Sequence, residues 1–210
     1  ANFAGVCGHK PSFGVVPQRG YIDHVSYGST DADINVFGPL ARTVGDLELL
    51  FGVLNGSADD SKSGWQVRLP NSRASSENLR VAAWLDDPSC PVSSSVLSVL
   101  DETVQAIEAD GVAVNRSARP EVVFDDVRNV GMPLISAATS PGRTSEEFAA
   151  LVETAADPAS DSTLRMRAAS STMSHRDWLL MTEQRDINRR LWSDFFCDFD
   201  VLLAPVAFSP

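Results

Sequence analysis

The sequence predicts an α/β fold, and two observations carry that prediction. Residues 79–84 form an apolar run of strand length, residues 92–109 show an apolar stripe at helical spacing, and residues 112–114 return to an apolar run. A strand, a helix and a second strand in this order are typical of α/β architecture. Turn residues mark both boundaries of the helix, with Asp-Asp-Pro at 86–88 and Gly111 after its end.

The first half of the chain changes from turns to one helix and then to a polar stretch. Glycine and proline recur every few residues over 1–40, which leaves little room for long helices. Thr43 predicts a helix N-cap, because Asp46 follows three residues later as an approximate capping box. We expect this helix to run through Leu54 and stop at Gly56. Residues 55–78 are polar and predict a surface excursion.

The second half is mostly helical in pattern. Residues 123–172 predict helices that break at Met132-Pro133 and at the turn 140–142, and Thr144 predicts a new helix start. A long helix is expected over 174–196, where apolar residues share one face. Residues 200–205 read as a short apolar strand stopped by proline. We find no repeat or low-complexity linker that would divide the chain, which predicts one domain over 1–210.

Composition excludes several classes of function. The 210 residues carry 17 Lys and Arg against 28 Asp and Glu, for a net charge of −11. An acidic chain of pI 4.6 offers no basic face for nucleic acid. No apolar run approaches the ~20 residues of a membrane helix. The three cysteines form no CxxC pair or Cys/His cluster, so we expect reduced thiols, a cytoplasmic location and no metal site.

A self-contained active site is not evident. The three histidines have no G-x-S-x-G or H-E-x-x-H motif beside them, and His175 reads as a capping or surface residue. Lys10 lies in a glycine-rich stretch, but Pro11 follows it, which excludes a phosphate-binding loop. Lys10 is then a buried ion-pair partner or a catalytic base, and the first interpretation is favoured. Cys7 reads as a buried small residue rather than a nucleophile.

Several segments in order resemble the amidase signature family of amide hydrolases. The family follows its nucleophilic serine with Gly-Gly-Ser-Ile-Arg-x-Pro-Ala, then with Gly-Val-x-Gly-x-Lys-Pro-Thr-x-Gly, and later with Gly-Pro-Met-Ala-Arg-Ser-Val-x-Asp-Leu. A late helix and a strand Asp-x-Leu-Leu-x-Pro follow. Ala1 is similar to the last residue of the first run, and the second run is matched by Gly5-Val6, Gly8, Lys10-Pro11, Ser12 in place of Thr, and Gly14. The run Gly38–Leu47 is similar to the third motif, Arg185 and Trp192 to the late helix, and Asp200–Pro205 to the strand. The resemblance covers essentially the whole chain.

The resemblance implies a mixed β-sheet flanked by helices on both faces. It also implies a Ser–cis-Ser–Lys triad, whose nucleophile would stand five residues before Ala1, with the oxyanion hole just before that nucleophile. We therefore expect 1–210 to be an incomplete domain that lacks the amino-terminal catalytic segment and a carboxyl-terminal tail. On this comparison Lys10 belongs to the turn after the nucleophile and is not the catalytic lysine. No catalytic residue is expected within the chain.

The function expected from this resemblance has two levels. The parent protein would hydrolyse C–N bonds of linear amides, and the 210-residue chain alone would be inactive. The alternatives are a non-catalytic binding or interaction module derived from the fold, and part of a glutamine amidotransferase A-type subunit. We expect a small-molecule amide as ligand of the complete protein, with no cofactor, metal, nucleic acid or membrane partner. An exposed sheet edge leaves a homo-oligomer possible.

The resemblance suggests substrate-pocket residues in two places. Phe13 follows the turn after the nucleophile, and Gly131 and Met132 belong to a segment that we expect to be irregular. For Phe13 ordinary core packing is the competing and favoured interpretation, because buried aromatic residues are mostly core.

Overall fold

The computed structural model describes residues 1–18, 34–56, 64, 66–69 and 78–210. These residues divide between two compact units. Unit 1 comprises Ala1–Leu69 and Gly131–Met181, and unit 2 comprises Pro70–Val130 and Thr182–Pro210. Two of the three boundaries between the units, those after Val130 and after Met181, fall within helices. Each unit is described by itself.

The described residues of unit 1 are mainly helical and include a small antiparallel strand pair. Its elements are the 3₁₀-helix η1 (Asn2–Ala4), β1 (Cys7–Gly8), β2 (Leu40–Ala41), α1 (Val44–Leu54), the second half of α3 (Phe124–Ala138), the 3₁₀-helix η3 (Ser140–Gly142), α4 (Ser145–Ala156), α5 (Ser162–Ser171) and the start of α6 (His175–Asp198). Cys7 pairs with Ala41 in the antiparallel register. The described residues 1–18 and 34–40 thus contribute turns and short strands, as their glycine and proline content predicts.

The β1–β2 pair depends on a close backbone approach at Gly38. The His9 N–H donates to the carbonyl of Pro39 at 3.1 Å, just beyond the paired residues. A Cβ placed on Gly38 would lie 1.8 Å from the His9 carbonyl oxygen, so no other residue fits without moving the backbone. Gly38 is therefore required by contact with its neighbour rather than by its own dihedral angles.

Helix α1 begins as the sequence predicts. The Asp46 N–H donates to Thr43 Oγ1 at 3.1 Å, which makes Thr43 the N-cap. The helix ends at Leu54, where Asn55 caps it by donating from Nδ2 to the Phe51 carbonyl at 2.8 Å. The predicted stop at Gly56 lies two residues beyond the observed end. The surface excursion predicted for 55–78 falls largely outside the described residues.

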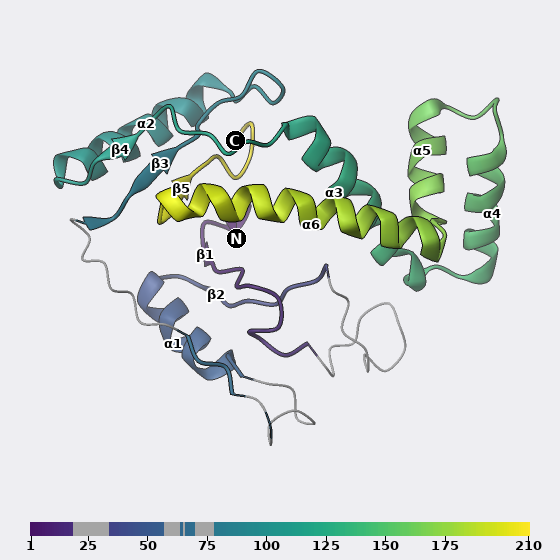
Figure 1. The fold of residues 1–210 in the computed structure, drawn as a ribbon, viewed down its shortest axis with the longest axis horizontal. Helices are drawn as coiled ribbons and strands as arrows, with labels where there is room; N and C mark the ends of the chain where they lie inside the picture. The colour runs from purple at the N-terminus through teal and green to yellow at the C-terminus, as the bar shows by residue number, and fades with distance from the viewer. Residues whose placement is uncertain (19–33, 57–63, 65, 70–77) are drawn as a thin grey trace. The chain divides into compact units, whose positions relative to one another are not determined.

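Helices α4 and α5 form a paired hairpin in unit 1 (Figure 1). The predicted start at Thr144 is confirmed by a complete capping box, in which Thr144 Oγ1 accepts from the Glu147 N–H and the Glu147 carboxylate accepts from the Thr144 N–H. Asp161 caps α5 by accepting from two backbone N–H groups. Ala168 of α5 is almost fully buried, and its small side chain permits close helix packing.

Helix α3 corrects the prediction of a break at Met132-Pro133. The helix is continuous from Phe124 to Ala138 with Pro133 inside it, so Gly131 and Met132 are helical rather than irregular. Proline removes one helical hydrogen bond and disfavours the preceding turn. Val130 and Leu134 are both buried on this helix, and their packing outweighs that local cost.

Unit 2 is built on a three-stranded parallel sheet. Its strands are β3 (Val81–Ala83), β4 (Val114–Asn115) and β5 (Val201–Leu203), in the order β4-β3-β5. Helix α2 (Ser94–Ala109) joins β3 to β4, and α6 leads into β5. The predicted strand–helix–strand unit is therefore confirmed, with strands shorter than the apolar runs. All three residues of β3 are buried, as befits a central strand.

Helices cover both faces of this sheet. Side chains alternate between the faces of a strand, so Val81, Val201 and Leu203 share one face, and Ala82 and Leu202 share the other. Ile107 of α2 lines a cavity with the first group, whereas Trp192 of α6 lines a different cavity with Leu202. The α/β class and the two-faced cover are confirmed. Parallel and antiparallel pairings occur in separate sheets among the described residues.

Replacing Gly38 by alanine should lower the free energy of unfolding by about 2 kcal/mol or more, because the new Cβ collides with the His9 carbonyl. Gly52→Ala is the matched control. Gly52 lies in α1 with open space around its Cα, so the same change should stabilise the helix by up to about 1 kcal/mol. Urea titration of both variants measures the difference, and equal effects would contradict the contact.

Candidate functional site

A salt bridge between Arg80 and Asp200 aligns two strands of unit 2. Arg80 Nη2 lies 2.7 Å from Asp200 Oδ1, and Arg80 Nε donates to Asp200 Oδ2 at 3.0 Å. The Arg80 backbone N–H donates to the same Oδ2 at 2.9 Å, and the Asp200 N–H donates to the Arg80 carbonyl at 2.8 Å. Arg80 and Asp200 stand directly before β3 and β5. Their bidentate, charge-assisted pairing therefore favours the register in which Val81 lies opposite Val201.

The pairing also sets the charge state of the carboxylate. Hydrogen bonds from the Arg80 side chain, and then from its backbone N–H, lower the pKa of Asp200 to about 2. The same side-chain hydrogen bond to Asp200 raises the pKa of Arg80. Arg80 Nη1 also donates to the Cys197 carbonyl near the end of α6, at 2.8 Å. The arginine therefore ties together β3, β5 and the helix that leads into β5.

The aligned strands end side by side at a cavity. The Trp84 N–H, one residue past β3, donates to the Leu203 carbonyl at 2.8 Å, so both carboxyl ends finish at the same level. Beyond them lies a cavity of about 220 Å³. It is lined by Trp84, Leu85, Asp86, Asp87, Cys90, Val92, Val122, Phe124, Val127, Trp192, Leu202, Ala204, Pro205 and Phe208. All of these residues belong to unit 2.

The cavity occupies the place where open α/β sheets bind ligands. Strand β3 lies between β4 and β5. After β3 the chain passes through α2, on one face of the sheet, to reach β4. Strand β5 follows α6, which lies on the opposite face. Loops from adjacent strands therefore diverge at the carboxyl ends of β3 and β5. Such a topological switch point leaves a crevice between the loops.

Aromatic rings form one wall of the cavity. The rings of Trp84 and Trp192 are stacked, with centroids 6.5 Å apart and an interplanar angle of 30°. Trp192 also stacks on Phe196 and meets Phe195 edge-on, each with a centroid distance of 6.3 Å. Phe195 and Phe196 do not line the cavity themselves, but their contacts restrain the orientation of the Trp192 ring.

The polar groups of the lining are engaged in the loop that leads to α2. Asp86 Oδ1 accepts from the Val92 N–H at 3.1 Å, and Asp87 Oδ1 accepts from the Ser89 N–H at 2.8 Å. The Ser93 N–H, at the start of α2, donates to the Phe208 carbonyl at 2.7 Å. These bonds fix the loop and leave a cavity whose walls are mainly apolar. The arrangement suits burial of an apolar group.

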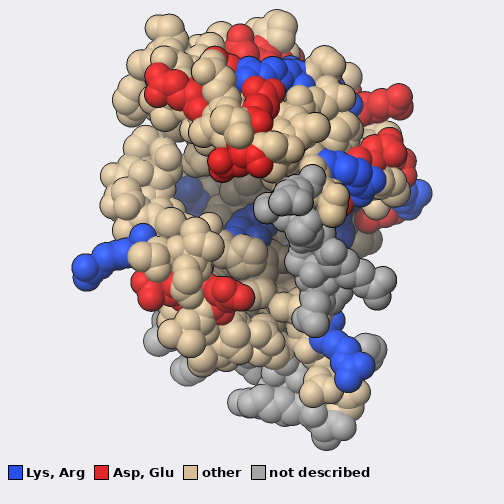
Figure 2. Space-filling view, turned by 90° about the vertical axis from the view of Figure 1, so that its left-hand side faces the viewer, with Lys and Arg blue, Asp and Glu red and all other residues tan. Residues whose placement is uncertain are grey.

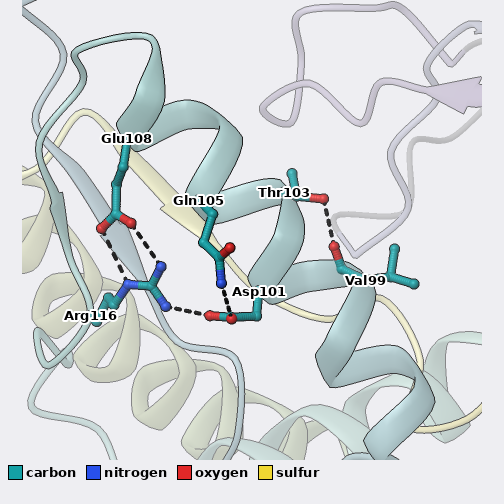
Figure 3. Close-up of polar contacts among 6 residues, drawn as sticks. All are labelled: Val99, Asp101, Thr103, Gln105, Glu108 and Arg116. Atoms are coloured by element: carbon teal, nitrogen blue, oxygen red, sulfur yellow. Dashed lines mark hydrogen bonds and ion pairs between the residues drawn. The ribbon is translucent and has the colours of Figure 1, made fainter.

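A second ionic cluster joins α2 to the segment that follows β4. Arg116, one residue past β4, donates to both carboxylate oxygens of Glu108, from Nε at 3.2 Å and from Nη2 at 2.8 Å (Figure 3). It also pairs with Asp101, which accepts a further hydrogen bond from Gln105. Hydrogen bonds from Arg116 lower the pKa values of both carboxyl groups. In Figure 2 acidic and basic side chains lie side by side at the top of the view, where α2 lies.

The residues predicted from the sequence are not among those that line this cavity. Phe13 is 49% exposed and Met132 is 56% exposed, and neither they nor Gly131 line it. Lys10 is exposed, so the interpretation as a buried ion-pair partner is wrong. Cys7 is half-buried in β1 rather than fully buried. His175 is the first residue of α6 and is exposed, as predicted for a capping or surface position.

The cavity itself was not predicted. One signal for it was present, because Trp84 stands at the end of an apolar strand directly before the Asp86-Asp87-Pro88 turn. The other walls come from segments more than thirty residues away in the chain, which sequence spacing does not join. Among the described residues no group of three or more His, Cys, Asp or Glu could hold a metal ion. No helix in the described part of the chain is long and apolar enough to cross a membrane.

Comparison with known proteins gives one consistent family. The family described as Amidase matches residues 1–210. An indoleacetamide hydrolase of Bradyrhizobium diazoefficiens is 25% identical over all of this chain and 39% of its own length. The A-type subunit of the glutamyl-tRNA(Gln) amidotransferase of Sulfolobus acidocaldarius is 28% identical over 55% of this chain and 24% of its own length. The chain thus spans well under half of each of these relatives.

Solved structures show the same fold. The crystal structure of an amidase matches with a TM-score of 0.63 at 20% identity, covering 99% of this chain and 42% of its own. A bacterial aryl acylamidase of the amidase signature family matches with a TM-score of 0.61 at 18% identity, covering 97% of this chain and 42% of its own.

Replacing Asp200 by asparagine should lower the melting temperature at neutral pH. It should also remove the part of the pH dependence of stability that comes from the Asp200 carboxylate. The carboxyl pKa is about 2 in the folded chain, below its ordinary value of 3.8. Its contribution to stability is therefore complete above pH 3.8 and is lost as the pH falls through about 2. The difference in melting temperature between the two proteins should shrink over that interval.

Asp125→Asn is the matched control, because Asp125 pairs with Arg128 on one exposed helical turn. A single surface ion pair contributes little, whereas Asp200 accepts three hydrogen bonds from Arg80, so Asp125→Asn should melt close to the wild type. A constant difference between wild type and Asp200→Asn from pH 6 to pH 2 would contradict the account. Differential scanning calorimetry across that range measures both.

Proposed function

The chain belongs to the amidase family, and from that premise we propose that it forms part of a longer amide-bond hydrolase acting on linear amides. The observation that carries the proposal is the family match over the entire chain, together with the 39% share of an indoleacetamide hydrolase that the chain spans. The activity of the complete protein would then depend on residues outside 1–210. A Ser–cis-Ser–Lys triad supplied there would provide the nucleophile and its base.

The 210-residue chain alone is proposed to be inactive. Lys10 is exposed, and no hydrogen bond joins it to a serine among the described residues. Lys62 lies outside the described residues. Without an activated serine, nothing attacks the amide carbonyl to form a tetrahedral intermediate, and without oxyanion donors that intermediate is not stabilised.

Within this function the cavity of unit 2 is proposed to hold the apolar part of the amide substrate. Its walls are almost entirely apolar, and it lies at the carboxyl ends of β3 and β5. A cavity of about 150 Å³ accommodates benzene, so 220 Å³ admits an aromatic ring with a short substituent. The names of two relatives, an indoleacetamide hydrolase and an aryl acylamidase, agree with an aromatic amide.

The amidotransferase alternative fits this cavity less well. Free glutamine carries a charged amino group and a charged carboxylate, both of which need polar partners when they are buried. The carboxylates of Asp86 and Asp87 could pair with the amino group, but none of the described lining residues is a Lys, Arg or His that could pair with the carboxylate. An arylalkyl amide places its ring in such a cavity without that cost.

Phe13, Gly131 and Met132 are proposed to contact substrate in the complete protein, where segments outside this chain would complete a pocket around them. The three cysteines are free, which agrees with a reducing, cytoplasmic location. Association of copies through an exposed strand edge is a further possibility for the isolated chain.

The isolated chain should release no ammonia from phenylacetamide above the buffer background, because it lacks the nucleophile and its base. A coupled ammonia assay on protein repurified through a second column measures this. Turnover that follows the protein through that column would contradict the proposal. Reading the coding sequence on both sides of these 210 codons provides the companion test, since a serine- and lysine-containing amidase segment should be in frame upstream.

Filling the cavity should weaken ligand binding. Val127 lines the cavity from α3, so Val127→Trp should reduce the affinity for phenylacetamide about tenfold or more by occupying the ring's place. Val123→Trp is the control, because Val123 is 62% exposed and does not line the cavity. Equilibrium dialysis measures binding to each protein. Equal affinity of the two variants would place the ligand elsewhere.

A further inference from the structure

We propose that Arg119 is a positioning residue that holds the Trp84 ring in the cavity wall and so makes the cavity selective for flat rings. The inference rests on the cavity's proposed role in binding substrate. Arg119 lies outside the cavity lining, whereas Trp84 forms part of it. Arg119 therefore acts through the tryptophan, without presenting its own charge to the ligand.

The guanidinium is anchored by backbone carbonyls. Arg119 Nη1 donates to the carbonyls of Ala83 at 3.1 Å, Ala118 at 2.7 Å and Arg116 at 3.2 Å. The first belongs to the last residue of β3, and the other two belong to the segment that follows β4. Arg119 thus bridges the carboxyl ends of the adjacent strands β3 and β4.

The backbone that presents Arg119 is itself held in place. Asn115 Oδ1 accepts from the N–H groups of Ser117 at 3.0 Å and Ala118 at 2.9 Å, which forms a tight turn just before Arg119. Arg116 is tied to α2 by its ion pairs with Glu108 and Asp101. The position of Arg119 is therefore set by groups that make no contact with a ligand in the cavity.

From this anchored position the cation faces the indole. The Arg119 guanidinium carbon lies 5.5 Å from the centroid of the Trp84 ring, within the range of a cation–π interaction. Trp84 also stacks on Trp192, so two neighbours restrain the ring. Arginine suits this place because its planar group can donate to carbonyls and stack on an aromatic face together, which lysine does less well.

A restrained indole discriminates between ligand shapes. A flat ring can lie against a fixed aromatic wall, whereas a puckered ring of similar size makes poorer contact with it. If the indole moves, the wall adapts to both shapes and the discrimination falls. Arg119 should therefore affect the ratio of affinities for flat and puckered rings more than the affinity for apolar ligands in general.

The test compares phenylacetamide with cyclohexylacetamide, which share the acetamide group and differ in ring flatness. Equilibrium dialysis gives the ratio of their dissociation constants for the wild type, Arg119→Gln and Arg119→Lys. Arg119→Gln should reduce the preference for the flat ring about fivefold, the size expected for loss of a cation–π restraint. Arg119→Lys should retain part of the preference. Arg176→Gln, at an exposed arginine outside unit 2, should leave it unchanged.

A double-mutant cycle separates positioning from general support. In a Trp84→Leu background, Arg119→Gln should produce no further change in the ratio, because the group that it positions is gone. An unchanged ratio in Arg119→Gln alone, or an equal reduction in both backgrounds, would overturn the inference. If the wild type binds neither ring, the proposed role of the cavity fails first, and the selectivity assigned to Arg119 fails with it.

Discussion

The site of unit 2 depends on one interaction, the ion pair between Arg80 and Asp200. These residues are 120 positions apart in the sequence, and each stands directly before a strand of the parallel sheet. Two short strands of three residues each offer few ladder hydrogen bonds, so we infer that the bidentate pair at their start helps to set their register. That register carries Trp84 and Ala204 to the same level at the other end, where the cavity opens. A slip by one residue would turn every strand side chain to the opposite face.

Local features of the fold follow well from the sequence. Thr43 and Thr144 are identified as N-caps by the residues three positions later, because capping is a contact within a single turn. Gly111 ends α2 with a positive φ of 87°, a conformation that favours glycine. Pro133 shows the limit of such reasoning. Its local cost is visible in the sequence, but the packing of Val130 and Leu134 that outweighs it is a tertiary effect.

The candidate site could be predicted only in outline. A resemblance carried by short motifs gives the family and the class of chemistry, and the comparisons confirm that family over 1–210. The cavity combines the end of β3, the start of α3, one turn of α6 and the segment after β5, so it exists only once the sheet has formed. The contact of Arg119 with Trp84 is similar, since no spacing rule relates a loop arginine to a ring 35 positions earlier. Phe13 was suggested by its place near a family motif and Met132 by a segment expected to be irregular, and neither lines this cavity.

The most direct measurement of the central claim is amide hydrogen exchange at Trp84 in the wild type and in Asp200→Asn. The Trp84 N–H donates to the Leu203 carbonyl at the cavity end of the strand pair, far along the strands from the ion pair itself. If the pair sets the register, exchange at Trp84 should accelerate in the variant while the capped start of α4 keeps its protection. Unchanged protection at Trp84 would show that the strands align without the ion pair, which would contradict the account.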